Sequence, residues 1–541
     1  MNLKDQIVSS LEKASKVKNP NLEFASHEEF GDYTTNVALR NATSAKDLVA
    51  KLQKDKDLTK IVEKIEVAGP GFINFHLKKE ALLTELAKVL KEKEDYGRSY
   101  EGKGKVVVID YSAPNIAKRF SIGHLRSTII GQALYNLHKF TGYKVIGDNH
   151  LGDWGTQFGV LIYMVEKNKV DPTKLTVEEW EKLYVDFHTK LDSDPSLKEE
   201  ARHAFKRLEE ADPAAKAIWQ AAYDTSLKEY QRLYDLLKVK IDYAYGESFY
   251  EPMLDTIIKE VQSKKIAKES QGAQIIEFKD LPPAMLVKSD GATTYLTRDL
   301  AAIKYRIKTW NPDLFIYEVG ADQILHFKQV FATSRLLGWI KDQKMVHVAH
   351  GLVRFKEGKM STRRGKTVKL EEVLKEAVEK AKEFNSDPKI SELVGIGAIK
   401  YFDLIHEPQS EIIFDWSKIF VLEGKSGPYL QYTYARTQSV LSKAKANNLK
   451  KETPSLNQEE LSTLRLLTRF PEVISISTKT YSPNILAEYL FTLAQKYNAF
   501  YNKHKIIEGD NQDFRLALTI GVGHVLKNGL NLLGIQAPQK M

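Results

Sequence analysis

The stretch from residue 105 to residue 149 constrains the fold of this chain more than any other. It opens with the apolar run KVVVIDYS (105–112) between residues that break regular structure, which is typical of a strand buried in a parallel sheet. Segment 124–140 carries apolar residues at the period of an amphipathic helix, and 143–149 predicts a second strand. The apolar face of that helix consists of Leu125, Ile129, Ala133 and Leu137. The succession of strand, helix and strand is a βαβ unit, from which nucleotide-binding α/β sheets are built.

Further apolar runs at 284–289, 314–320 and 345–353 predict more strands. Between the early and late strands, about residues 164–240 are charged and helical in pattern, which predicts a helical insertion. We therefore expect an α/β fold with a Rossmann-type parallel-sheet catalytic domain over 104–385.

The two ends of the chain predict different architectures. Residues 1–103 combine helical patterns with a Gly-Pro-Gly break at 69–71 and a strand pattern after it, so we expect a small α+β N-terminal domain. From about residue 390 onward no further strand is predicted, and apolar residues follow helical spacing. Residues 386–541 are expected to form an all-α C-terminal bundle.

Composition narrows the range of functions. With 541 residues, the chain is too long for a single hydrophobic core. It contains no cysteine, which excludes disulfides, cysteine nucleophiles and thiolate zinc sites, so no zinc is expected and no metal site is predicted. No apolar run approaches the ~18 residues of a membrane helix, so we expect a cytoplasmic protein without a membrane partner. The net charge of +9 permits a nucleic-acid partner without requiring one.

The loop SAPNIAKRFSIGHLRS (112–127) is a candidate phosphate site. It lies at the carboxyl end of the first predicted strand, and the helix that follows offers free N–H groups and the positive end of its dipole. Gly123 would let a nucleotide lie against the backbone, and His124 can donate to a phosphate oxygen. Further positive charge comes from Lys118, Arg119 and Arg126. The alternative is an ordinary helix start with a surface histidine.

A second polar stretch, FKEGKMSTRRGKTVKL (355–370), is rich in Gly, Lys and Arg. Its cations and hydroxyls suit a polyphosphate, although by itself such a segment is more typical of a solvated basic loop. The two stretches together resemble the signature motifs of the class I aminoacyl-tRNA synthetases, written HIGH and KMSKS. They stand here as Ser121-Ile122-Gly123-His124 and Lys359-Met360-Ser361-Thr362-Arg363.

The resemblance is most specific to the arginyl-tRNA synthetase family and runs from about residue 24 to the last residue. Besides the two motifs, it rests on GDYTTNVA (31–38), GPGFINFHL (69–77), NHLGDWGTQFG (149–159), TTYLTRDLAA (293–302), GADQILHFKQV (320–330), GPYLQYTYAR (427–436) and GLNLLGIQAPQKM (529–541). It implies ATP-dependent activation of L-arginine to arginyl-adenylate and transfer of the arginyl group to tRNA-Arg.

Two departures from the class I pattern affect which residues are expected to bind ATP and to act in catalysis. Ser121 replaces the first histidine of HIGH, and Thr362 replaces the second lysine of KMSKS. In arginyl enzymes a lysine just upstream of HIGH is suggested to stand in for that lysine, which here implies Lys118. The resemblance implies Lys118, His124 and Lys359 as catalytic residues. The ATP-binding residues that it implies are Ser121, Gly123, His124, Lys359, Met360 and Ser361.

A pocket for arginine needs carboxylates, because the guanidinium is planar and always charged. The resemblance implies an arginine site made of Asp110, Asn115, Tyr295, Asp299 and Gln323. Structural alternatives remain for three of them. Asp110 can pair with a neighbouring base, Tyr295 can be a core aromatic, and Asp299 can be an acid in the first turn of a helix capped by Thr297.

The resemblance also implies partners. ATP is expected as a substrate together with Mg²⁺. The N-terminal domain is similar to one that contacts the tRNA elbow, and the C-terminal bundle is similar to an anticodon-binding domain. Because the family is mostly monomeric, a monomer is expected. Three alternatives stay open: another class I synthetase, an enzyme that adenylates a small carboxylate without RNA, and a non-catalytic RNA-binding paralogue.

Overall fold

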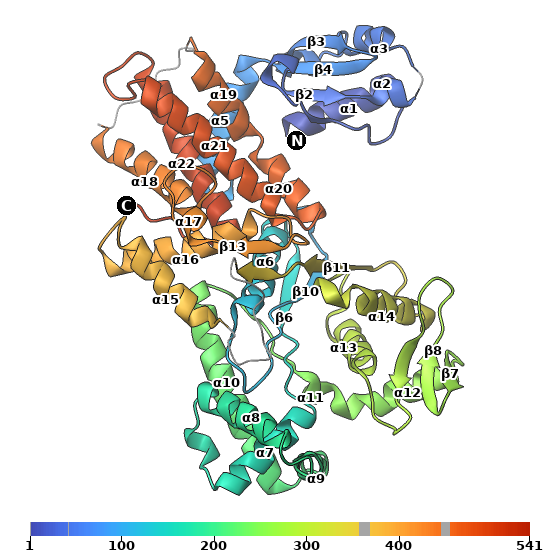
Figure 1. Ribbon diagram of the computed structural model, residues 1–541. Coiled ribbons are helices and arrows are strands. Elements are labelled where there is room, and N and C mark those ends of the chain that lie inside the picture. The colour runs from blue at the N-terminus through green and yellow to red at the C-terminus, as the bar shows by residue number, and fades with distance from the viewer. Residues whose placement is uncertain (1, 42, 356–367, 445–454) are drawn as a thin grey trace.

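The βαβ unit supplies two adjacent strands, β5 and β6, of a four-stranded sheet in the computed structural model, which describes residues 2–41, 43–355, 368–444 and 455–541. The strand order is β11-β10-β5-β6, and each neighbouring pair is parallel (Figure 1). The elements are β5 (Val106–Asp110), α6 (Ile122–Phe140), β6 (Lys144–Asp148), β10 (Leu314–Gly320) and β11 (Lys344–His350).

The strand order reverses beside β5. Strand β6 lies on one side of β5, whereas β10 and β11 lie on the other. At such a reversal a crevice opens outside the carboxyl ends of the strands. Asp110 and Asp148 end β5 and β6 in register with each other, and Gly320 and His350 end β10 and β11 in the same way. The sheet therefore gathers these strand ends and the loops that follow them at one edge.

The chain between β6 and β10 folds into two units. The first is helical and lies below the sheet in Figure 1. It contains α7 (Thr156–Asn168), α8 (Val177–Leu191), α9 (Leu197–Glu209) and α10 (Pro213–Leu237). Helix α10 begins at a strong start signal, because the side chain of Asp212 accepts from the N–H of Ala215 and proline occupies the first turn.

The second unit has its own hydrophobic core and an antiparallel sheet of order β7-β8-β9. The apolar run at 284–289 contains β9, which therefore belongs to this sheet and not to the parallel one. The β7–β8 hairpin turns at Gln271 and Gly272, both with positive φ, as tight hairpin turns require. Its elements between β6 and β10 are α11 (Glu247–Tyr250), α12 (Leu254–Ser263), β7 (Ala267–Ser270), β8 (Ala273–Ile276), β9 (Ala284–Val287) and α13 (Tyr295–Trp310). Helix α14 (Ile324–Leu336) follows β10 in the chain and packs against α13.

The N-terminal unit is a four-stranded sheet of order β1-β2-β4-β3 with helices packed against it. Antiparallel pairing joins β2 to β4 and β3 to β4. Its elements are α1 (Leu3–Ser15), β1 (Glu23–Phe24), β2 (Tyr33–Thr35), α2 (Val37–Arg40), α3 (Ala45–Leu52), α4 (Leu58–Ile61), β3 (Val62–Ala68) and β4 (Phe72–Leu77).

The last third of the chain is a helical bundle, with one exception. Strand β13 (Ile412–Phe414) pairs in parallel with β12 (Val353–Phe355), so the expectation that strands end near residue 390 was wrong. Three residues are too short a run to show a period of two. The helices are α15 (Leu370–Ala381), α16 (Pro388–Leu404), α17 (Trp416–Ile419), α18 (Gly427–Lys443), α19 (Gln458–Thr468), α20 (Phe470–Lys479), α21 (Pro483–Lys503) and α22 (Gln512–Leu532).

Helix α5 (Lys79–Glu92) follows the N-terminal sheet in the chain but packs among the C-terminal helices, where Figure 1 shows it in blue between red ribbons. Leu86 and Val89 lie against Gly521 of α22, which leaves no room there for a larger residue. The side chain of Asn528 donates to the carbonyl of Lys93 at 2.8 Å. Within the part of the chain that the structure describes, no helix is long and apolar enough to cross a membrane.

Candidate active site

The start of α6 holds the Ser121–His124 pair. Ser121 precedes the helix, and its backbone N–H donates to Nδ1 of His124 at 3.1 Å. Because Nδ1 accepts this hydrogen, Nε2 carries the imidazole proton. Burial lowers the pKa of His124 to about 4, and the nearby charges of Lys118 and His350 add to this effect. His124 is therefore a neutral donor at physiological pH. Among the described residues, a Cβ built on Gly123 would have only Ser121 Oγ within 4 Å, at 3.5 Å.

Lys118 lines a cavity of about 600 Å³ together with Asn115 and Tyr295. Its Nζ lies 5.1 Å from the ring centre of Tyr184 on α8, and among the described residues it forms no ion pair. Burial lowers its pKa, against the opposing charge of Glu181. A lysine in this state can offer its positive charge to an anion that enters the cavity. Tyr295 is 69% exposed, so it is not a core aromatic.

The amide of Asn115 is fixed by its neighbour across the cavity wall. The backbones of Asn115 and Gly152 form a parallel bridge, and a Cβ on Gly152 would lie 2.0 Å from Oδ1 of Asn115. Only glycine leaves the asparagine side chain in place at this position.

Asp110 has an internal partner, which was the structural alternative left open for it. Nη2 of Arg306 lies 2.7 Å from Oδ2 of Asp110, and Nε of Arg306 lies 2.8 Å from Oδ2 of Asp148. All three side chains are buried. Burial opposes the charge of Arg306, but the two carboxylates outweigh it and raise its pKa well above the usual value. Sequence reasoning missed Arg306 and Asp148. The available signals were the end of the second strand and a cation seven residues, two helical turns, after Asp299.

Asp299 pairs with His326. Oδ2 of Asp299 lies 2.5 Å from Nε2 of His326, and the residues lie near the starts of α13 and α14. Burial works against the charge of Asp299, but the hydrogen bond from His326 lowers its pKa. Among the described residues, Oδ1 of Asp299 accepts no hydrogen bond. The residue before α13 is Thr294, not Thr297, so the helix does not begin where the structural alternative had placed its cap. Gln323 is exposed at the start of α14, on the same helix as His326.

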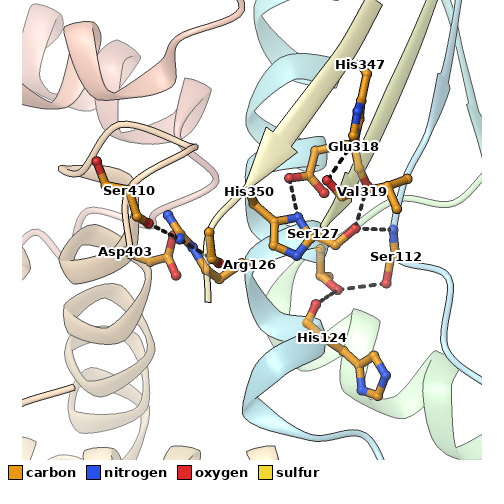
Figure 2. Close-up of polar contacts among 12 residues, drawn as sticks. Ser112, His124, Arg126, Ser127, Glu318, Val319, His347, His350, Asp403 and Ser410 are labelled. Carbon is orange, nitrogen blue, oxygen red and sulfur yellow. Dashed lines mark hydrogen bonds and ion pairs between the residues drawn. The ribbon is translucent and has the colours of Figure 1, made fainter. Parts of the chain in front are cut away.

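Two of the cations expected near the phosphates point elsewhere. Arg119 pairs with Glu178 and Glu181 of α8. Arg126 is buried, and Figure 2 shows it directed toward Asp403 and Ser410, away from His124. Its Nε lies 3.2 Å from Oδ1 of Asp403. Helix geometry explains the error for Arg126, because successive residues of α6 face different directions and position 126 faces α16.

A second buried pair lies behind α6. Nδ1 of His350 is 3.0 Å from Oε1 of Glu318, and the carbonyl of Glu318 accepts from the hydroxyl of Ser127 at 2.9 Å. Ser127 in turn accepts from the backbone N–H of Ser112, the first residue of the candidate phosphate loop, as Figure 2 shows. Sequence reasoning missed this pair as well. His350 ends β11, where it lies opposite Gly320 of the neighbouring strand β10, two residues beyond Glu318. The available signal was the position of both residues near the ends of predicted strands.

Lys359, Met360 and Ser361, the residues expected to form the second signature motif, lie outside the described residues. The described site therefore offers a neutral donor at a helix start, a free lysine beside a cavity, and an ionised carboxylate with one unpartnered oxygen. The donor and the lysine suit a phosphate-bearing ligand, and the carboxylate suits a cationic ligand.

Comparisons with known families agree with this chemistry. Residues 85–416 match the catalytic domain of the class I tRNA synthetases of the R type, 430–541 match the DALR anticodon binding domain, and 1–77 match the arginyl tRNA synthetase N terminal domain. The fold and the site thus define a class I aminoacyl-tRNA synthetase.

Individual relatives narrow the class. An arginine–tRNA ligase of Clostridium botulinum is 39% identical over 544 residues, covering 96% of each chain, and one of Halothermothrix orenii is 40% identical over 516 residues, covering 92% of this chain and 90% of that one. The crystal structure of the arginyl-tRNA synthetase of Plasmodium falciparum has a TM-score of 0.83 at 26% identity, with both chains fully covered. The chain belongs to the arginyl-tRNA synthetase family, and its activity is that of an arginine–tRNA ligase that uses ATP.

Proposed function

We propose that Asp299 receives the guanidinium of arginine in this ligase. The observation that carries this assignment is the state of its carboxylate, which is ionised, oriented by His326, and has an unpartnered Oδ1. A planar cation with several N–H donors is the ligand that such a carboxylate binds best. Tyr295 lies one helical turn before Asp299, on the same face of α13, and supplies a wall.

We further propose that Asn115 and Gln323 bind the amino and carboxylate groups of arginine. Asn115 lines the same cavity as Tyr295, and its amide offers both donors and an acceptor. Asp110 then acts from a distance. Its carboxylate is neutralised by Arg306, so it orients the wall of the pocket and leaves Asp299 as the acid that meets the substrate.

At the nucleotide end, we propose that Ser121, Gly123 and His124 bind ATP, with Lys118 as the cation. A carboxylate oxygen of arginine attacks the α-phosphorus, and the bond to pyrophosphate breaks. The Nε2–H of His124 donates to a phosphate oxygen and Lys118 offsets the charge that develops there. Lys359, Met360 and Ser361 are assigned to the same phosphates by family resemblance. In the second step the 2′-hydroxyl of the terminal ribose of tRNA-Arg takes the arginyl group and AMP leaves.

Magnesium is proposed to enter with ATP. No group of three or more His, Asp or Glu side chains among the described residues could hold a metal ion, so its ligands would be phosphate oxygens. No step above depends on a metal held by the protein.

We also propose three domains, at 1–103, 104–385 and 386–541, with an insertion at about 164–240, and a cytoplasmic monomer without a membrane partner. The family descriptions support an anticodon-binding role for the last domain. The packing of α5 against α22 gives the first and last domains a shared boundary.

The test is an ATP–pyrophosphate exchange assay with tRNA present and a panel of amino acids. Arginine is expected to support exchange and charging, and lysine, glutamate and cysteine are not. Asp299→Ala is expected to abolish arginine-dependent exchange with an unchanged melting temperature, whereas Asp322→Ala, on the exposed turn before α14, serves as the matched control. Charging with another amino acid, or full activity of Asp299→Ala, would refute the assignment.

A further inference from the structure

Three hydroxyl-bearing residues on one face of α10 reach the loop that precedes the start of α6. They are Ser226, Tyr230 and Tyr234, four residues apart, so their side chains project in the same direction along the helix. All three are buried. Helix α10 belongs to the helical unit below the sheet, and it touches this loop from outside the parallel-sheet core (Figure 1).

Each of the three residues bonds to the loop. Ser226 Oγ accepts from the backbone N–H of Ala117 at 2.9 Å. Tyr230 donates toward the carbonyls of Asn115 and Lys118, with oxygen–oxygen distances of 2.6 and 2.8 Å.

Tyr234 completes the series at the other end of the loop, where its hydroxyl lies 2.9 Å from Oγ of Ser112. These contacts cover the loop from its first residue to Lys118.

The loop needs external support. Ser112 and Ala117 have φ values of 59° and 61°, a region that residues other than glycine seldom adopt and that costs of order 1–3 kcal/mol each. Such a conformation persists only where its surroundings over-determine it. Four of the partners that fix it, Ser226, Tyr230 and Tyr234 from α10 and Thr128 from α6, are buried hydroxyls.

Tyr230 is the member of this series whose hydrogen-bond partners line the cavity. Both carbonyls that it binds belong to residues that line the cavity, Asn115 and Lys118. Burial raises the pKa of Tyr230 well above its usual value and that of Tyr234 to about 12, so both hydroxyls remain donors at every working pH. The ring of Tyr230 also packs edge-on against Phe120, at 5.7 Å between centroids.

We propose that Tyr230 is a positioning residue of the synthetase reaction, which holds the carbonyls of Asn115 and Lys118 so that the amide and the ammonium of these two residues point into the substrate cavity. Helix α10 thereby sets the geometry of the signature loop from a separate unit of the fold. The inference rests on the proposed roles of Lys118 and Asn115.

The test is a pair of double-mutant cycles in ATP–pyrophosphate exchange, with kcat and the KM values for ATP and arginine measured separately. Tyr230→Phe removes only the hydroxyl and is expected to lower kcat at least tenfold, with the melting temperature shifted by only a few degrees. Because Tyr230 acts through Lys118 and Asn115, the double variants Tyr230→Phe/Lys118→Met and Tyr230→Phe/Asn115→Ala are expected to be no slower than Lys118→Met and Asn115→Ala alone. A purely structural role would instead multiply the losses.

Tyr223→Phe is the matched control, because Tyr223 lies on the same helix and stacks on Trp219, and its hydroxyl forms no hydrogen bond with any residue that the structure describes. It is expected to retain the kcat of the unmodified enzyme. If Tyr230→Phe fails to fold, Ser226→Ala, which removes the acceptor for Ala117, is expected to lower kcat in the same way.

The possible failures are distinguishable. A wild-type kcat in Tyr230→Phe, or in Ser226→Ala where that variant is used, overturns the inference, and so do multiplicative losses in both cycles. Full activity of Lys118→Met alone refutes the proposed role of Lys118, and the inference is then decided by the Asn115 cycle. Full activity of both Lys118→Met and Asn115→Ala overturns it.

Discussion

Nε2 of His326 lies 2.5 Å from Oδ2 of Asp299, so the acid proposed to receive arginine already holds a cationic partner. Burial opposes the charge of His326, but the carboxylate outweighs this effect and raises its pKa above the usual 6.5. The charged group that faces His326 is Asp299. A second titratable group, His347, lies on the other side of the Phe327 ring. Protonated His326 and the substrate guanidinium therefore compete for one carboxylate.

This competition predicts a pH dependence with a definite sign. His326 is protonated below its raised pKa, and as the pH rises through that pKa the competing charge is lost. The KM for arginine is therefore expected to fall as the pH rises above 6.5, by up to tenfold per unit for one proton. His326→Gln keeps a donor but cannot titrate, so it is expected to flatten this dependence. An equal slope in both proteins would contradict the prediction.

For His124, in contrast, we expect a contribution to kcat that does not depend on pH. Its pKa of about 4 keeps the ring neutral throughout the working range. His124→Asn is expected to lower kcat for exchange by about 10²–10³, the usual effect of losing one donor to developing charge. The ratio of wild-type to variant kcat is expected to be the same at pH 6 and pH 9. A ratio that grows toward acid pH would mean that His124 acts as a cation.

Replacing Arg306 is expected to lower the stability of the folded protein strongly. Arg306→Met leaves the buried carboxylates of Asp110 and Asp148 without their partner, and breaking a buried pair in this way costs about 3–5 kcal/mol. Thermal unfolding measures the loss. Adding Asp148→Asn is expected to recover part of it. The control is Arg232→Met, because Arg232 pairs with Glu229 and Glu371 at an exposed position, where the expected loss is below about 1 kcal/mol.

Lys400 is expected to make the stability of the folded protein depend on pH. Its ammonium is buried and donates to the carbonyls of Leu237 and Gly534, and burial lowers its pKa to about 7. The folded protein therefore releases a proton that the unfolded chain retains, so stability falls as the pH decreases from the usual lysine pKa toward 7. Lys400→Met is expected to lack this slope in melting temperature between pH 9 and pH 7. A parallel slope would show that other groups cause it.

Several features of the fold followed from the sequence because they rest on local signals. The apolar run of β5, the periodic face of α6 and the run of β6 predicted the central unit, and strand ends predicted the binding edge. Strands β7, β8 and β13 did not follow, because they are only three or four residues long, and the partner of β13, strand β12, also lies far away in the chain.

The site was predictable in residue type but not in pairing. The sequence pointed to Asp110 and Asp299 as acids of one pocket, whereas their cations, Arg306 and His326, come from helices whose placement depends on tertiary packing. The same limit explains Arg126. Its charge was evident, but its direction depended on where α16 lies.

Helix α5 and the helix α22 that packs against it lie far apart in the chain, so they are synthesised at different times. The apolar residues Leu82, Leu86 and Val89 of α5 are made before most of the catalytic domain, whereas the residues of α22 that pack against α5 are made after it. At a typical elongation rate of about 5–20 residues per second, the wait is on the order of tens of seconds. During that time the apolar face of α5 lacks the cover that α22 provides in the folded protein.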